Sequence, residues 1–281
     1  MIVEKVKGAG FCFGVKRALR IALDVARTET LPVYTIGPII HNPQMVERLR
    51  NEGVVPIEDI HDVPPGTVVV RSHGIKPCLL EEAEDRGHRV VDATCPFVRK
   101  AQNYAAELCR AGYKVVIVGK KDHPEVEGLL GHAGGDAVVV YEESDLKDLG
   151  RYRRIGVIAQ TTIPLGWFSQ IMARLMEHTR ELKAYNTICS STHRRQSQTV
   201  ELARKADLMI IVGGRNSANT SRLVELCRKI GTKTCHIEVA EEILPDWVKG
   251  KELVGISAGT STPSWIVDEV VKRLDDLRNE V

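Results

Sequence analysis

Three segments of similar composition divide this chain, VKGAGFC at residues 6–12, VVDATC at residues 90–95 and AYNTIC at residues 184–189, and each ends on a cysteine. The three cysteines, Cys12, Cys95 and Cys189, are 83 and 94 residues apart. A long amphipathic run follows each one and carries a group of basic residues. These groups are Lys16-Arg17, Arg99-Lys100 and His193-Arg194-Arg195. Repetition at a nearly fixed period indicates copies of one structural unit, so we predict a threefold internal repeat.

The spacing after each cysteine supports this repeat. A glycine closes the next apolar run 25, 24 and 24 residues later, at Gly37, Gly119 and Gly213. A polar residue stands four positions beyond each glycine. These residues are His41, His123 and Ser217. Each unit of the repeat thus provides one thiol and one polar loop.

The composition excludes several classes of protein. Its 39 basic and 37 acidic residues leave a formal charge of +2, and aromatic residues make up only 5% of the chain, so we expect no nucleic-acid partner. The start MIVEKVKGAGFCFG has no apolar signal segment, and no apolar run reaches the roughly 18 residues of a membrane span. Seven cysteines without close pairing are typical of a reducing compartment, so we expect a cytoplasmic protein without membrane association.

Short runs rich in valine and isoleucine alternate with amphipathic patterns, which predicts an α/β protein with parallel sheets. Strands are expected at Val68–Val70, Val115–Val118, Val138–Tyr141, Gly156–Ala159, Met209–Val212 and Leu253–Ile256. Helices are expected at Lys16–Ala26, Gln44–Asn51, Phe97–Ala111, Pro124–His132, Leu165–Leu182, Arg194–Ala206, Asn219–Ile230 and Pro263–Arg278. Ligands of parallel α/β sheets bind at the carboxyl ends of the strands, where the cysteines and polar loops should lie.

Each repeat contains further equivalent segments. Its second polar loop is RSHGIKP, AQTTIPL or SAGTSTP, and its acidic stretch, IEDIHDV, EESDLKD or VAEEILPDW, is expected to be a solvated connection. The third repeat lacks a closing strand, which the N-terminal segment Met1–Lys7 can supply. We therefore predict three pseudo-symmetric α/β lobes around a central metal centre: residues 13–95, residues 96–188, and residues 189–281 together with 1–12.

Cysteines at equivalent strand ends are better explained by metal ligation than by core packing. Thiolates suit iron–sulfur clusters, zinc or copper. A structural zinc site needs a fourth protein ligand, and the repeat offers no fourth equivalent. A [4Fe-4S] cluster held by three cysteines would leave one iron open to substrate, so we favour this cofactor. The cysteines expected in the core instead are Cys78, Cys109 and Cys227.

The polar loops contain candidate anion-binding residues. Histidines that can be protonated near neutral pH are good partners for a diphosphate. Hydroxyl, amide and helix N–H groups at the start of a helix also suit phosphate oxygens, although Asn219 could simply be an N-cap. The candidates are His41, His73, His123, Ser217, Asn219, Ser261 and Thr161.

Glu125 is the candidate acid of this set. It follows His123 by two residues, in the first turn of a predicted helix, where the helix dipole alone favours an acidic residue. In a water-poor cavity the same carboxyl could instead keep or relay a proton. The motif HPEVEG does not match HExxH, so a zinc-protease site is excluded.

Nine motifs occur in order from the first cysteine to Pro263: GFCFGVKRA, IIHNP, SHG, DATCP, HPEVEG, QTT, NTIC, GGRNSANTSRL and SAGTSTP. With them the chain resembles the 4-hydroxy-3-methylbut-2-enyl diphosphate reductases, the iron–sulfur enzymes of the non-mevalonate isoprenoid pathway. The resemblance implies three α/β lobes around a central [4Fe-4S] cluster with ligands that match Cys12, Cys95 and Cys189. It also implies reductive dehydroxylation of (E)-4-hydroxy-3-methylbut-2-enyl diphosphate to isopentenyl and dimethylallyl diphosphate.

The same resemblance assigns roles to the loops. It implies that Glu125 donates a proton, with Thr161 and His123 beside it in the catalytic set. It implies that the diphosphate is bound by His41, His73, His123, Thr161, Ser217, Asn219 and Ser261. Position 218 is alanine where relatives often carry a small polar residue, so only its backbone could contact the substrate. A ferredoxin- or flavodoxin-type protein should deliver the electrons.

Two other functions are compatible with three such cysteines. A cluster-dependent hydratase or lyase would use the open iron as a Lewis acid without external electrons. An iron–sulfur sensor or scaffold would have no need of the polar loops. Dependence on a reductant separates the reductase from the hydratase, and dependence on His123 and Glu125 separates it from the scaffold.

Overall fold

A computed structural model describes residues 1–30 and 32–279 of the chain. Residue 31 and residues 280–281, which belong to the predicted first and third lobes, lie outside the described part. Within the described residues the strands form three four-stranded sheets in which every pairing is parallel. Helices connect these strands, so the predicted α/β class with three small parallel sheets is confirmed.

The contacts of the chain divide it into two compact units. The unit that we call the terminal unit comprises Met1–Lys16, Ile40–Glu47 and Ser190–Val281. Its sheet has the order β1-β12-β10-β11. The strands are β1 (Ile2–Lys5), β10 (Leu208–Val212), β11 (Thr234–Ile237) and β12 (Leu253–Ala258). Its helices are α7 (Ser190–Ala203), α8 (Ala218–Ile230), α9 (Pro245–Val248) and α10 (Ser264–Asn279), while α1 (Phe13–Thr28) and α2 (Pro43–Asn51) include residues of both units.

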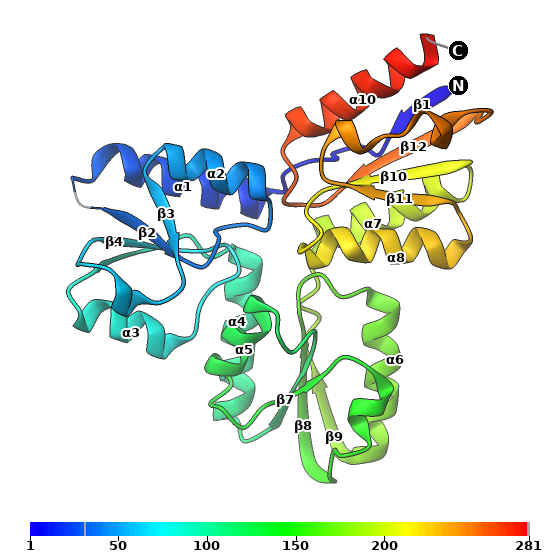
Figure 1. Cartoon of the computed structure of the whole chain (residues 1–281). Helices are drawn as coiled ribbons and strands as arrows, with labels where there is room; N and C mark the ends of the chain where they lie inside the picture. The colour runs from blue at the N-terminus through cyan, green and yellow to red at the C-terminus, as the bar shows by residue number, and fades with distance from the viewer. Residues whose placement is uncertain (31, 280–281) are drawn as a thin grey trace. The chain divides into compact units, whose positions relative to one another are not determined.

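The N-terminal strand completes the sheet of the terminal unit. In Figure 1 the blue strand β1 lies beside the orange strand β12, and α10 lies close to both. The backbone N–H of Ile2 donates to the carbonyl of Glu252 at 2.7 Å, and the N–H of Val6 donates to that of Ile256 at 2.9 Å. The prediction that the N-terminal segment supplies the closing strand of the third repeat is confirmed.

The second unit, which we call the middle unit, comprises Arg17–Ile39 and Arg48–Cys189 and contains the other two sheets. One has the order β3-β2-β4-β5, with β2 (Val33–Ile36), β3 (Val54–Ile57), β4 (Thr67–Val70) and β5 (Arg89–Asp92). The other has the order β7-β6-β8-β9, with β6 (Lys114–Val118), β7 (Val138–Val140), β8 (Tyr152–Ala159) and β9 (Thr179–Ala184). The helices are α3 (Pro77–Asp85), α4 (Pro96–Arg110), α5 (Pro124–His132) and α6 (Leu165–Leu175). None of the described helices is long and apolar enough to cross a membrane.

All three sheets have the same strand order when each is read along its own repeat. The first strand of the repeat (β2, β6 or β10) pairs with the second on one side and the third on the other, and the closing strand pairs with the third. The third strands are β4, β8 and β12, and the closing strands are β5, β9 and β1. This common topology agrees with the repeat seen in the sequence. The lobe boundaries at residues 13–95, 96–188 and 189–281 with 1–12 stay a prediction.

One sequence-based assignment is wrong. The helix predicted over Leu165–Leu182 ends at Leu175, and after a short 3₁₀ turn the chain enters β9. Backbone pairing with β8 outweighs the strong helical preference of Arg180, Glu181, Leu182 and Lys183. The acidic stretches connect strands and their acidic side chains are mostly exposed, as predicted, but each also forms a 3₁₀ turn that buries an apolar side chain. These side chains are Ile60, Leu146 and Ala240.

Helices cover both faces of the β6–β9 sheet, and alternate strand residues face each layer. The side chains of Val116, Val118 and Val157 pack with those of α6, whereas those of Ile117 and Ile158 pack with α4 and α5.

Glycine in the third strand lets a helix approach closely. A Cβ atom at Gly156 of β8 would lie 2.7 Å from Leu108 of α4. At Gly255, the corresponding residue of β12, it would lie 2.9 Å from Leu202 of α7. The helix that follows the cysteine therefore packs on the third strand in the same way in both units.

This packing predicts opposite effects for two glycine-to-alanine changes in the middle unit. Gly156→Ala should lower the free energy of unfolding by about 1–3 kcal/mol, because the methyl group overfills the contact with Leu108. Gly166→Ala, an exposed position of α6 with open space around it, should be neutral or stabilise by up to about 1 kcal/mol. Urea unfolding of both variants measures this, and equal midpoints for the two would contradict the packing described here.

Candidate active site

Each of the three repeat cysteines is held by the same backbone hydrogen bond. The N–H of Cys12 donates to the carbonyl of Thr260 at 3.1 Å, that of Cys95 to Ser72 at 3.0 Å, and that of Cys189 to Thr161 at 2.9 Å. Each acceptor lies two residues beyond the end of the third strand of a sheet, and each cysteine directly precedes a helix, α1, α4 or α7. The carboxyl edge of each sheet therefore carries one cysteine. Cys12 belongs to the terminal unit, and Cys95 and Cys189 belong to the middle unit.

The other described cysteines occupy different surroundings. Cys227 is buried in the core, and burial raises the pKa of its thiol to about 12, as expected for a packing residue. Cys109 is partly buried against the core of the middle unit, in agreement with its expected packing role. The expectation for Cys78 is wrong, because it is exposed near the start of α3. Periodicity places Cys78 on a helix but does not reveal that this position of the first turn faces solvent.

The most strongly perturbed acid of the middle unit is Glu125. It lies in the first turn of α5 and its residue surface is only 2% exposed. The backbone N–H of Thr161 donates to Oε1 at 2.6 Å, and the Thr161 hydroxyl donates to Oε2 at 2.9 Å. Burial raises the pKa of the Glu125 carboxyl to about 7, although both hydrogen bonds from Thr161 act in the opposite direction. This carboxyl can therefore hold or release a proton near neutral pH.

Two histidines of the predicted site lie close together in the middle unit. The rings of His73 and His123 meet edge to face, with centroids 5.5 Å apart and planes at 82°. His123 is the N-cap of α5, and its Nδ1 accepts the backbone N–H of Glu125 at 3.1 Å. A neutral His123 ring must then carry its proton on Nε2, which makes Nε2 a hydrogen-bond donor. The structure thus brings His73, His123, Glu125 and Thr161 into the same unit, with direct contacts linking successive members.

Gln160 is a candidate that the sequence analysis missed. It is 1% exposed and precedes Thr161 in the loop after β8. Its Oε1 accepts the backbone N–H of Lys120 at 3.1 Å, whereas its Nε2 is buried without a hydrogen-bond partner in the described residues. A buried amide donor that the protein does not satisfy is suited to a bound ligand. The sequence could have indicated Gln160, because this residue lies at the carboxyl end of a buried strand and directly precedes Thr161.

The terminal unit brings together another part of the predicted set. Ser217 is the N-cap of α8, and its Oγ accepts the backbone N–H of Thr220 at 3.3 Å. The hydroxyl of Ser261 lies 3.2 Å from the carbonyl oxygen of His41 and 3.4 Å from the Ser217 hydroxyl. Three loops of this unit therefore meet beside the start of α8.

Asn219 has unsatisfied polar atoms at the same helix start. It is 3% exposed, and neither Oδ1 nor Nδ2 has a hydrogen-bond partner in the part of the chain that the structure describes. The alternative that Asn219 is only an N-cap is wrong, because Ser217 fills that position. An unsatisfied amide, two hydroxyl groups and a helix N-terminus form a suitable environment for phosphate oxygens.

The backbone beside Asn219 depends on glycine. Gly213, which follows β10, has a φ of 142°, and a Cβ atom there would lie 2.4 Å from the Thr262 hydroxyl. At the next residue, Gly214, a Cβ atom would lie 2.7 Å from the carbonyl oxygen of His41. There is therefore no room for a side chain at Gly213 or Gly214, where the loop after β10 approaches the loops with Thr262 and His41.

This fold and site define an α/β protein of three repeats that carries a cysteine and a hydroxyl-bearing loop at the carboxyl edge of each sheet. The family described as LytB protein matches residues 3–275. The chain belongs to this LytB family.

Curated relatives and solved structures cover nearly the whole chain. The 4-hydroxy-3-methylbut-2-enyl diphosphate reductase of Syntrophotalea carbinolica is 46% identical over 96% of this chain and 96% of its own. The protein of the same name from Geobacter sp. (strain M21) is 46% identical over 98% and 97% of the two chains.

A solved (E)-4-hydroxy-3-methyl-but-2-enyl diphosphate reductase, described as the terminal enzyme of the non-mevalonate pathway, matches with a TM-score of 0.72 and 43% identity over 98% and 100% of the two chains. The E-1-hydroxy-2-methyl-but-2-enyl-4-diphosphate reductase from Plasmodium falciparum matches with a TM-score of 0.92 and 26% identity over 96% and 87%. The resemblance found in the sequence motifs is confirmed.

The raised pKa of Glu125 makes the stability of the protein depend on pH. The native carboxyl titrates near pH 7, whereas an unfolded glutamate titrates near about 4.3, so between these values the native state binds more protons than the unfolded state. The free energy of unfolding should therefore fall as pH rises through this window, by about 4 kcal/mol in full.

Glu125→Gln should remove this dependence. Relative to the unmodified chain, the variant should gain about 2 kcal/mol of stability between pH 5 and pH 8. Urea unfolding at several pH values measures the gain. A pH-independent change in stability from altered contacts with Thr161 cancels, because the gain is the difference between two pH values. Glu84→Gln, at an exposed position of α3, is the matched control. Stability curves that stay parallel across this range would contradict the buried, high-pKa carboxyl.

Proposed function

We propose that this chain is a 4-hydroxy-3-methylbut-2-enyl diphosphate reductase. Two electrons and two protons would convert (E)-4-hydroxy-3-methylbut-2-enyl diphosphate into isopentenyl or dimethylallyl diphosphate, with the hydroxyl group leaving as water. The observation that carries the proposal is the buried Glu125, held by Thr161 with a pKa of about 7. Such a carboxyl can deliver the proton that a leaving hydroxyl requires at neutral pH. The names of relatives that are 46% identical over almost the whole chain support the same activity.

The residues of the terminal unit are suited to the diphosphate. Asn219 offers an amide that the protein leaves unsatisfied, and the hydroxyls of Ser217 and Ser261 lie 3.4 Å apart beside it. The backbone N–H groups at the start of α8 add positive potential. We propose that His41 and His73 add charge-assisted hydrogen bonds to this anion when their rings are protonated, and that His123 donates to it from Nε2 of its neutral ring.

The cofactor proposed for this site is a [4Fe-4S] cluster with Cys12, Cys95 and Cys189 as ligands. The donor set fits, because thiolates are the preferred ligands of such clusters and each cysteine precedes the positive end of a helix. The backbone N–H of Val15 lies 3.5 Å from the Cys12 sulfur, which supports negative charge on that atom. When bound, the cluster would supply the electrons and an iron that acts as a Lewis acid. That the three sulfurs meet at one centre stays a prediction.

The protein side chains would control the protons. Thr161 donates its hydroxyl hydrogen to Oε2 of Glu125, which fixes the carboxyl orientation. His123 caps the same helix turn through the Glu125 N–H, so its ring and this carboxyl are held at the start of α5. We propose Gln160 Nε2 as a further donor to the bound substrate, since it is buried and unsatisfied. The burial of Glu125 and Gln160 would exclude competing water from the reaction.

The partners follow from this chemistry. A one-electron carrier of the ferredoxin or flavodoxin type should reduce the protein. No nucleic acid or membrane is needed for the reaction. A cytoplasmic location, where thiols stay reduced, suits the seven cysteines of the chain.

The test of this function is an anaerobic assay with reduced viologen and the allylic diphosphate, with products identified by mass spectrometry. Viologen should be oxidised only when substrate is present, and both isomeric diphosphates should form. Glu125→Gln should bind substrate with nearly unchanged affinity but react about 100- to 10,000-fold more slowly, because an amide cannot donate the proton. Glu84→Gln should behave like the unmodified chain.

Two results would contradict the proposal. Hydration or elimination of the substrate at a rate indifferent to viologen would indicate a lyase. Near-normal reduction by Glu125→Gln would remove this residue from the proton path.

A further inference from the structure

Arg195 is a buried cation that the proposed reaction does not use. It lies on α7, six residues after Cys189, and is 7% exposed. Its Nη1 donates to the carbonyl oxygens of Gly10 at 2.7 Å, Ala258 at 2.8 Å and Gly259 at 3.1 Å. Its Nη2 donates to the carbonyl oxygen of Gly8 at 2.6 Å. One guanidinium group thus binds four backbone carbonyls of the terminal unit.

These carbonyls belong to two segments that carry proposed site residues. Gly8 and Gly10 lie in the loop that leads to Cys12, and Ala258 and Gly259 lie at the end of β12, where the loop with Ser261 begins. The first loop contains no helix or strand, and both of its glycines have positive φ, 73° and 123°. Its path therefore depends on bonds from outside the loop, and Arg195 provides two of them.

We propose that Arg195 is a positioning residue that sets the Cys12 thiolate for cluster binding. It would act through the Gly8–Gly10 backbone, which it fixes against the end of β12, and the bond from Cys12 N–H to Thr260 joins the same two segments. This inference rests on the proposed function, in which Cys12 is a cluster ligand. The planar guanidinium carries five N–H donors on three nitrogens, so Nη1 and Nη2 can bind different carbonyls, whereas the ammonium of a lysine has three donors on one nitrogen.

A second contact of the same kind occurs in the middle unit. Arg17 lies on α1, five residues after Cys12, and its Nη1 donates to the carbonyl oxygen of Thr94 at 3.1 Å. Thr94 directly precedes Cys95. The basic groups that follow the cysteines in the sequence therefore include two arginines that each hold the backbone leading to a different cysteine.

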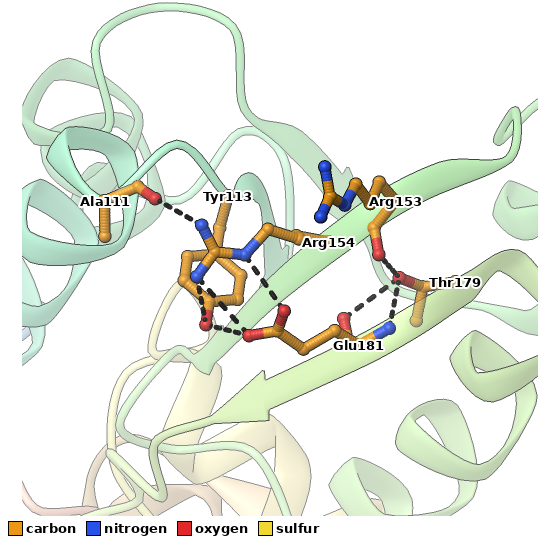
Figure 2. A network of polar contacts seen from close by, with 6 residues as sticks. All are labelled: Ala111, Tyr113, Arg153, Arg154, Thr179 and Glu181. Atoms are coloured by element: carbon orange, nitrogen blue, oxygen red, sulfur yellow. Dashed lines mark hydrogen bonds and ion pairs between the residues drawn. The ribbon is translucent and has the colours of Figure 1, made fainter.

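The segment leading to Cys189 is held through its side chains by α4, the helix that follows Cys95. The rings of Tyr104 and Tyr185 stack with centroids 3.9 Å apart, and Glu107 accepts hydrogen bonds from Tyr185 and, at 3.1 Å, from Lys183. Strand β9, which precedes this segment, is also tied to its neighbour. Figure 2 shows Arg154 of β8 joined to Glu181 of β9 and to Tyr113, with its guanidinium over the Tyr113 ring. The helix that follows each cysteine thus anchors the segment before another cysteine. Helix α7 anchors the segment before Cys12, α1 the segment before Cys95, and α4 the segment before Cys189.

The test uses the full-length chain with Arg195→Lys, and with Arg194→Lys as the matched control at the neighbouring exposed position. After anaerobic reconstitution, iron should pass to a chelator about 10- to 100-fold faster from Arg195→Lys than from the unmodified chain, as for other residues that orient metal ligands. The electron paramagnetic resonance spectrum of the reduced cluster should also change. Arg194→Lys should match the unmodified chain in both measurements.

A second measurement separates positioning from general stability and does not need the cluster. Before reconstitution, mass spectrometry can follow alkylation of each cysteine. In Arg195→Lys the rate should rise at Cys12 and stay unchanged at exposed Cys78 and buried Cys227.

An unchanged Cys12 rate, or iron release and a spectrum like those of the unmodified chain, would overturn the proposal. Increased reactivity of Cys227 would also overturn it, because Arg195 would then hold the whole unit rather than the Cys12 loop. An unmodified chain that binds no cluster would instead refute the proposed function, and the alkylation result would still decide the role of Arg195.

Discussion

The backbone hydrogen bond from each repeat cysteine to the loop after the third strand is the interaction on which the site depends. Parallel pairing places the carboxyl ends of the strands at one edge of each sheet, and this bond joins the cysteine to that edge. The acceptors, Ser72, Thr161 and Thr260, occupy equivalent positions. Because the bond uses main-chain atoms, it directs the chain into the next helix and leaves the sulfur available as a ligand.

The proposed chemistry is divided between the two units. In this proposal the middle unit would provide the proton donor, Glu125, which is buried and bound by Thr161, with His123 at the same helix start. The terminal unit provides the phosphate environment, with Asn219 and Ser217 at the start of α8. Both sets use the N-terminus of the helix that follows the first strand of a repeat. One topology therefore supports an acid in one repeat and an anion-binding loop in another.

Much of the fold could be predicted from the sequence because buried strands are rich in valine and isoleucine. The N-terminal strand could be inferred because the third repeat lacked its closing strand. The edge strand β9, with the polar sequence TRELKA, could not be predicted, since its partner strand and not its composition decides its structure. In the candidate site, loop position singled out Glu125 and Asn219, and the structure buries both. The roles of Gln160 and Arg195 depend on which buried atoms they meet, which a sequence does not show.

The central claim is that the three repeat cysteines together hold one cluster. Iron and sulfide analysis of anaerobically reconstituted Cys12→Ser, Cys95→Ser and Cys189→Ser tests it most directly. The controls are Cys78→Ser, at an exposed position, and Cys235→Ser, at a partly buried position of β11. We predict about four iron atoms per chain in the unmodified protein and both controls, and severe loss of iron in each of the other three variants. Full iron and an unchanged spectrum in any one of those three would contradict the account.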